Sequence, residues 1–176
     1  ININKKRIEI IHISYFMANY IMKLFGLMPD GQAIESFDLS NKNGMELTVI
    51  NYGVTVVSLK VPLKMGGIID VVLGFDNFQE YLKSFQLKGT TYFGATVGRF
   101  AGRINNGVFN LNGKSFLLNK NKNNHSLHGG IENFSQKIWK VENINEGENP
   151  SITLSCLSPD GEENYPGDLS VKLTYT

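Results

Sequence analysis

The sequence has a single cysteine, Cys156, among its 176 residues. One thiol can form neither an internal disulfide nor a zinc site of paired thiolates, so the chain needs no oxidising compartment. We therefore expect a reduced, cytoplasmic setting. Cys156 alternates into a predicted strand, where we expect a small core residue rather than a nucleophile.

Excess charge is also missing, because 17 Lys and Arg residues face 16 Asp and Glu residues and leave a net charge of +1. Binding to nucleic acid depends on concentrated positive charge, so we expect no nucleic-acid partner. Long apolar runs are absent as well, since polar side chains interrupt the apolar-leaning residues 1–27. This excludes a membrane span and disfavours a secretory signal, so no membrane partner is expected.

Histidine is scarce, with His12, His125 and His128 as the three examples, and their spacing is not typical of a zinc site. Neither a P-loop nor a GxGxxG fingerprint occurs in the sequence. We therefore expect no metal site, and we interpret His125 as a surface loop residue.

Helical periodicity is limited to the residues after Asn77, a good N-cap, which predict one or two helical turns. From Ser36 onward, apolar and polar residues alternate with a period of two, which is typical of half-buried strands. The predicted strands cover residues 45–50, 54–61, 92–97, 108–118 (as a hairpin), 139–144, 152–156 and 169–176. Seven or more short strands separated by turns predict an all-β sandwich or barrel.

Two local patterns refine this prediction. Asn112-Gly113 lies between the two runs of the hairpin, and both residue types tolerate the positive φ angles of a type I′ turn. The run at residues 169–176 alternates up to the last residue without a stop signal. A strand that ends in mid-pattern leaves backbone groups unpaired, so we expect the sheet to be truncated at its C-terminus.

Two arginines follow the predicted strand 92–97, in a glycine-rich segment at residues 98–107. The planar guanidinium of Arg99 or Arg103 could hold two adjacent oxygens, as in a carboxylate, a phosphate or a vicinal diol. Alternatively, both arginines pair with carboxylates at the edge of a sheet. The residues alone leave both interpretations open.

His128 lies between Leu127 and a pair of glycines. Glycines at this place allow a ligand or another stretch of backbone to approach the imidazole ring. Because imidazole exchanges a proton near neutral pH, His128 could assist acid–base chemistry or bind a hydroxyl. The alternative is a buried histidine that is hydrogen-bonded to a backbone carbonyl.

Five segments together resemble a known family. They are Asp70-Val71-Val72-Leu73-Gly74-Phe75, residues 92–104, residues 124–130 with Leu-His-Gly-Gly, Ser158-Pro159-Asp160-Gly161-Glu162-Glu163, and Tyr165-Pro166-Gly167-Asp168-Leu169. In this order and spacing, from Ser36 to Thr176, they resemble the aldose 1-epimerase (galactose mutarotase) family. As a set, these motifs are specific to that family.

The resemblance implies a large antiparallel β-sandwich that interconverts the α and β anomers of free hexoses such as glucose and galactose, without a cofactor. In that reaction a carboxylate takes the proton from the anomeric hydroxyl while a histidine protonates the ring oxygen. We accordingly expect residues 1–28 to be an uncertain N-terminal extension and residues 29–176 to be the N-terminal portion of a mutarotase-like sandwich. The oligomeric state is left open.

The resemblance also implies roles for single residues. Arg103 resembles the sugar-binding arginine, and His128 resembles the first of two active-site histidines, which binds the sugar and assists proton transfer. Gly102 departs from the Asn of many members and removes one possible hydrogen bond to a hydroxyl. The second histidine, the general acid, and the glutamate base are expected beyond Thr176, so the 176-residue chain alone is predicted to be inactive.

Other functions remain open. The chain could be a non-catalytic sugar-binding module or an inactive remnant. The related hexose-6-phosphate epimerases must hold a dianion with several cations. The segment offers two arginines, Arg99 and Arg103, of which we expect Arg99 to be structural, so this alternative is disfavoured.

Overall fold

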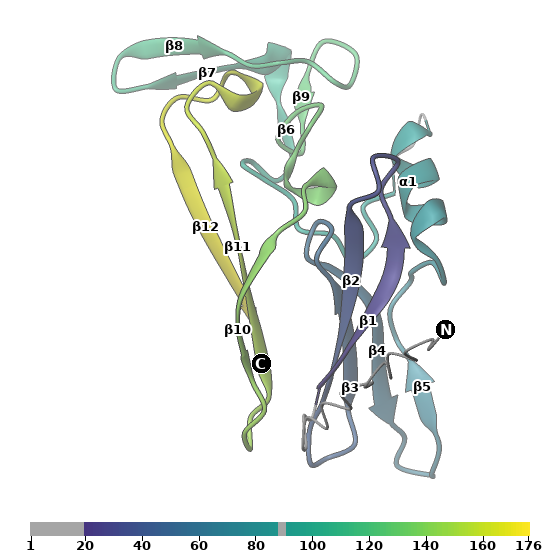
Figure 1. Ribbon diagram of the computed structural model, residues 1–176. Helices are drawn as coiled ribbons and strands as arrows, with labels where there is room; N and C mark the ends of the chain where they lie inside the picture. Colours follow the sequence, from purple (N-terminus) through teal and green to yellow (C-terminus); the bar gives the residue numbers. More distant parts are fainter. Residues whose placement is uncertain (1–19, 88–90) are drawn as a thin grey trace, which may run out of the picture.

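The computed structural model describes residues 20–87 and 91–176, and most of its regular structure is antiparallel β-strand (Figure 1). The larger sheet has the order β1-β2-β3-β4-β5, in which every pair of neighbours is antiparallel. Its strands are β1 (Tyr20–Leu27), β2 (Ala33–Ser40), β3 (Glu46–Ile50), β4 (Thr55–Pro62) and β5 (Ile68–Asp70).

The second sheet has three antiparallel strands in the order β10-β11-β12 and faces the larger sheet (Figure 1). Its strands are β10 (Lys140–Asn145), β11 (Ser151–Ser158) and β12 (Leu169–Tyr175). Two shorter ribbons are β6 (Arg103–Ile104) with β9 (Ser126–Leu127), and β7 (Val108–Leu111) with β8 (Lys114–Leu117). Short 3₁₀ turns are η1 (Asn105–Gly107), η2 (Phe134–Gln136) and η3 (Glu162–Asn164).

The two sheets share one hydrophobic core. Alternate residues of β2 and β3 point inward, as do Ile152 and Leu154 of β11, because successive strand side chains face opposite sides. Trp139, 1% exposed, lies in this core and donates from its indole Nε1 to the Phe134 carbonyl. The all-β, antiparallel sandwich predicted from the sequence is therefore confirmed.

One helix covers the outer side of the larger sheet. The helix α1 (Phe78–Gln86) begins after Asn77, whose side chain accepts a hydrogen bond from the Glu80 amide. Phe78 and Tyr81 are buried against residues of β2 and β3 in a second apolar cluster. The helix predicted after Asn77 is thus confirmed, with nine residues.

The hairpin prediction is also confirmed. Asn112 and Gly113 connect β7 to β8 with φ angles of 50° and 77°, so both central residues adopt the left-handed conformation that a type I′ turn requires. The Phe109 and Phe116 rings stack across the two strands at 5.3 Å.

The strand predicted at residues 92–97 is wrong, because this segment is irregular in the structure. It crosses near β4 through single backbone hydrogen bonds: the Val56 amide donates to the Gly94 carbonyl, and the Thr96 amide donates to the Gly53 carbonyl. Gly94 has a φ of 64°, a conformation outside the strand region. The apolar residues of this segment are explained by packing against the sheet, and their pattern resembles that of a strand.

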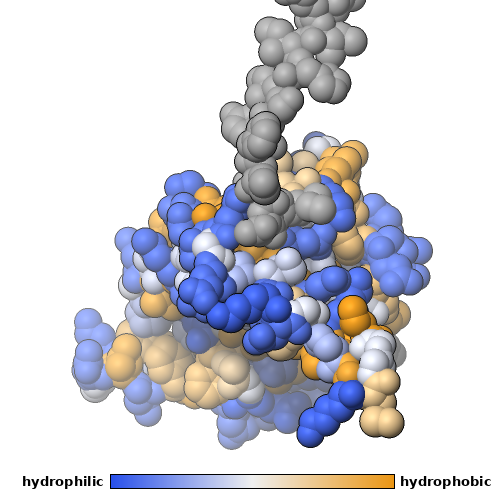
Figure 2. Space-filling model, turned by 90° about the horizontal axis from the view of Figure 1, so that it is seen from below, coloured by the Kyte–Doolittle hydropathy of each residue, from blue (hydrophilic) through white to orange (hydrophobic). Residues whose placement is uncertain are grey.

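Strand β1 lies inside residues 1–28 and pairs with β2 along its length, with a bulge between Leu24 and Gly26. The boundary between an extension and a domain at residues 28 and 29 stays a prediction. In the described ranges, no helix is long and apolar enough to cross a membrane. Hydrophilic and hydrophobic residues are intermixed over the lower end of the sandwich (Figure 2).

Candidate functional site

Arg103 and His128 are brought together by a two-residue ribbon. Strand β6 pairs antiparallel with β9, so that Arg103 lies opposite Leu127, next to His128. Arg103 is exposed, and its guanidinium has no hydrogen-bond or ion-pair partner within residues 20–87 and 91–176. The ribbon therefore presents a free cation beside an imidazole.

Gly102 orients His128 through two backbone contacts. The His128 amide donates to the Gly102 carbonyl at 2.9 Å, and the Gly102 amide donates to Nδ1 of the imidazole at 3.1 Å. A ring nitrogen that accepts a hydrogen bond carries no proton, so the proton of the neutral ring lies on Nε2. The backbone amide of Gly102 thus fixes the tautomer of His128.

The charge of His128 is set by its surroundings. Partial burial of the ring, and then the positive charge of Arg103, lower the pKa of His128 below its ordinary value. The ring is therefore neutral at pH 7. A neutral ring whose Nδ1 accepts from Gly102 can donate from Nε2 to an oxygen of a ligand.

An aromatic row supports the ring of His128 from the side of the helix. Tyr92 makes an edge contact with His128 at 4.7 Å between ring centroids. Phe85 of α1 packs on Tyr92 at 5.8 Å, and Tyr52 packs on Phe85 at 6.1 Å. Burial raises the pKa of Tyr92. The site is thereby anchored to the helix and to the larger sheet.

Arg99 has a different environment. Its guanidinium donates to the Ser158 side chain and carbonyl and to three further carbonyls of the segment 158–167, at distances from 2.7 to 3.2 Å. The guanidinium also lies 5.6 Å from the centre of the Tyr165 ring. The structural role expected for Arg99 is confirmed, but its partners are carbonyls and one hydroxyl rather than carboxylates.

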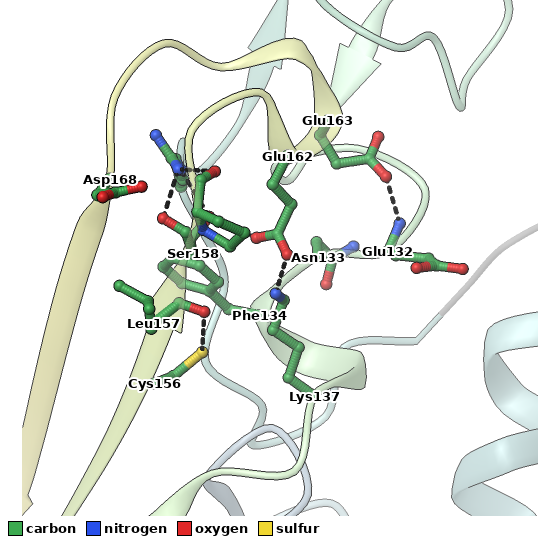
Figure 3. A network of polar contacts seen from close by, with 12 residues as sticks. Glu132, Asn133, Phe134, Lys137, Cys156, Leu157, Ser158, Glu162, Glu163 and Asp168 are labelled. Carbon is green, nitrogen blue, oxygen red and sulfur yellow. Dashed lines mark hydrogen bonds and ion pairs between the residues drawn. The ribbon is translucent and has the colours of Figure 1, made fainter.

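The segment that Arg99 holds reaches back to the loop after His128 (Figure 3). Glu163 accepts from the amides of Ile131 and Glu132, at 3.0 and 2.9 Å. Its neighbour Glu162 accepts from Ser158 and pairs with Lys137. Two adjacent acidic residues thus hold the β11–β12 loop in place. Glu163 binds the loop after His128, and Glu162 binds Lys137.

Close packing explains the two glycines after His128. A Cβ on Gly129 would lie 1.8 Å from the Gly98 carbonyl oxygen, and one on Gly130 would lie 2.2 Å from a Glu163 carboxylate oxygen. The groups that approach here are another stretch of backbone and a side chain, and they approach the glycines themselves rather than the imidazole ring.

The other candidate residues contact the protein itself, and their environments are typical of structural residues. His125 is half-buried and accepts a hydrogen bond from the Asn106 amide at Nδ1. Cys156 is half-buried against the core, which raises the pKa of its thiol. Phe134, Trp139 and Tyr165 are buried, consistent with core packing rather than sugar stacking. Within the described ranges, no group of three or more His, Cys, Asp and Glu side chains could hold a metal ion.

Three residues around the site were not singled out from the sequence: Tyr92, Asn121 and Glu163. Tyr92 and Glu163 contact the His128 loop from distant positions in the chain, whereas Asn121 lies six residues before Leu127, whose backbone it binds. Tyr92 was assigned to a strand, and Asn121 lies in a cluster of asparagines without a distinguishing pattern. Glu163 lies within one of the segments that resemble the family, and nothing in the sequence distinguishes it from its neighbour Glu162.

Comparison with known proteins identifies the family. The family model described as aldose 1-epimerase matches residues 35–176. Galactose mutarotase from Sus scrofa is 40% identical over 161 residues, which cover 91% of this chain and 44% of that protein. Aldose 1-epimerase from Haemophilus influenzae is 37% identical over 150 residues, 84% of this chain and 40% of that protein.

Solved structures agree with the sequence relatives. Galactose 1-epimerase from Lactobacillus acidophilus superposes with a TM-score of 0.73 and 26% identity, over 89% of this chain and 43% of that one. The GalM/aldose epimerase homologue from C. elegans gives a TM-score of 0.69 and 32% identity, over 79% and 40%. The chain thus spans less than half the length of these relatives, and by sequence and by fold it is a member of the aldose 1-epimerase family.

Proposed function

We propose that Arg103 and His128 bind a free hexose and that the chain contributes this part of an aldose 1-epimerase site. The observation that carries the proposal is the free guanidinium of Arg103 beside a neutral imidazole whose Nδ1 is already occupied. The planar fork of Arg103 matches two adjacent sugar oxygens, and the Nε2 proton of His128 matches a third.

In the proposed reaction, a carboxylate removes the proton of the anomeric hydroxyl, and an acid protonates the ring oxygen as its bond to the anomeric carbon breaks. The aldehyde then rotates and the ring closes on its other face, which returns both protons. His128 binds the sugar and assists proton transfer, while Arg103 fixes the orientation of the hydroxyls. The acid histidine and the glutamate base that the resemblance implies have no counterpart assigned among the described residues.

A free hexose fits these groups better than a hexose phosphate. A phosphate dianion is held by several cations, and Arg99 is already engaged by the segment 158–167. Arg103 is then the guanidinium left beside His128. We accordingly propose glucose and galactose as the substrate class, and a cytoplasmic setting on the basis of the single cysteine.

Binding is tested by titrating galactose and glucose into the 15N-labelled 176-residue chain. We expect the amides around Arg103 and His128 to shift, and Arg103→Ala and His128→Ala each to weaken binding about tenfold, which corresponds to the loss of one charge-assisted or positioned hydrogen bond. The exposed Lys114 on the hairpin gives the matched control, Lys114→Ala, which should bind as the wild type does. Shifts that exclude both Arg103 and His128 would overturn the proposal.

Catalysis is tested by polarimetry of freshly dissolved α-glucose. We propose that the 176-residue chain binds hexose without accelerating mutarotation. A rate above that of buffer, abolished by His128→Ala, would instead show that the chain carries a complete acid–base pair. Binding without acceleration supports either one part of an epimerase site or a sugar-binding module.

A further inference from the structure

The loop that carries His128 is held by a side chain that does not contact the imidazole. Asn121 donates from Nδ2 to the carbonyls of Leu127 and Gly130, at 2.8 and 2.6 Å. Its Oδ1 accepts from the Leu127 amide at 2.7 Å. One carboxamide thus binds the backbone on both sides of His128.

The segment between these contacts is a tight turn. The Gly130 amide donates to the Leu127 carbonyl at 3.2 Å, and the two central residues, His128 and Gly129, have φ angles of 54° and 95°. Positive φ at both central positions is the pattern of a type I′ turn. A histidine in this conformation is strained and persists only where its surroundings hold it.

The Asn121 side chain takes the place of a neighbouring strand. On one side of β9, the His128 amide bonds to Gly102, next to β6. On the other side, both polar backbone groups of Leu127 bond to Asn121. A two-residue strand has little intrinsic stability, so a partner on its second edge contributes directly to its position.

We propose that Asn121 is a positioning residue for the site, because it holds the Leu127–Gly130 turn that directs His128 towards Tyr92 and Arg103. The inference rests on the proposed function, because the orientation of the imidazole affects activity only if His128 binds a hexose. Its geometry can nevertheless be measured without any sugar.

The test uses Asn121→Leu, a neutral side chain of similar size, and Asn121→Ala in the 176-residue chain. We expect both variants to lose the NMR contacts between the rings of His128 and Tyr92. The pKa of His128 should rise towards its ordinary value as the ring becomes more solvated. Galactose binding should weaken roughly tenfold or more, because a misplaced group loses its alignment with the ligand.

Two controls separate positioning from general destabilisation. Asn124→Leu changes an exposed asparagine of the same loop and should leave the ring contacts and the pKa of His128 unchanged. Ile152→Val shortens a fully buried side chain in the distant core and should lower stability without moving either readout. Normal ring contacts and a normal pKa of His128 in the Asn121 variants would overturn the proposal.

If the variants do not fold, hydrogen exchange in the wild-type protein tests the proposal. The Leu127 amide, bonded to Asn121, should exchange with solvent deuterium at least about a hundredfold more slowly than an unprotected amide. Exchange at the unprotected rate would contradict the proposal. If the wild type does not bind galactose but these readouts behave as expected, the proposed function fails and the positioning role of Asn121 stands.

Discussion

Arg99 and Arg103 lie four residues apart in one glycine-rich segment, but their guanidinium groups have opposite environments. Arg99 makes five hydrogen bonds to the segment 158–167, whereas Arg103 is exposed without such a partner in the described ranges. The first joins the β11–β12 connection to the rest of the molecule, and the second faces outward beside His128. The same residue type therefore serves stability at one position and is available for binding at the other.

The largest effect that follows from this comparison is expected at Arg99. Arg99→Ala leaves several carbonyls without their donor, and we expect a loss of about 3–4 kcal/mol in the free energy of unfolding. Urea denaturation of the wild type and the variant measures this loss. Arg99→Lys should recover little of it, because one ammonium cannot reach all of these acceptors. A loss below about 1 kcal/mol would contradict the structural role of Arg99.

A second loss of stability is expected at the contact between Gly129 and the backbone of Gly98. Gly129→Ala places a methyl group against the Gly98 carbonyl at a positive φ, and we expect a loss of about 2–3 kcal/mol with displacement of His128. Gly161→Ala is the matched control, since its φ is also positive but no atom lies within 4 Å of the added carbon. It should cost only the strain of the left-handed conformation, about 1 kcal/mol. Equal losses at both positions would show that close packing at Gly129 is unimportant.

Arg103→Ala should have little effect on stability. With no partner for its guanidinium in the described part of the chain, we expect a change within about 0.5 kcal/mol in the free energy of unfolding. The same variant should lose most of its hexose affinity, so denaturation and sugar titration together measure the contrast with Arg99. A large loss of stability in Arg103→Ala would remove that contrast.

The smallest effect is expected from the protonation of His128. Its pKa is lower in the folded chain than the ordinary value of about 6.5 in the unfolded chain, because burial and Arg103 disfavour the cation. The unfolded state therefore takes up the proton first, and stability that is complete above about pH 6.5 is lost as the pH falls through the folded pKa. Urea denaturation between pH 7.5 and 5 should show a decline that is weaker in His128→Asn. The same slope in both proteins would assign the decline to other groups.

Elements defined by neighbouring residues could be predicted from the sequence. The Asn112-Gly113 hairpin follows from the left-handed preference of two adjacent residues, and the helix after Asn77 follows from its cap. The segment 92–97 was assigned wrongly, since apolar alternation reports burial and does not report whether a strand partner is present.

The contacts of the candidate site could be predicted from the sequence only in part, because they too depend on partners that the sequence does not identify. The resemblance to a family suggested Arg103 and His128, and the β6–β9 ribbon brings them together. The carbonyls that bind Arg99 belong to a chain segment far away in sequence, and the backbone groups that bind Asn121 lie six to nine residues away. Every residue has a backbone carbonyl, whatever its side chain, so the amino-acid sequence does not show which carbonyls make these contacts.

The hydrogen bond from the Gly102 amide to Nδ1 of His128 also prevents the imidazole from turning over. A ring that cannot exchange its two nitrogens presents a single edge to a ligand, the edge that carries the Nε2 proton. An electrophile such as diethyl pyrocarbonate reacts with an unprotonated ring nitrogen, and in His128 the Gly102 amide already occupies that nitrogen. The acylation of His128 should therefore be slow, and it should become faster where the contact with Gly102 is lost.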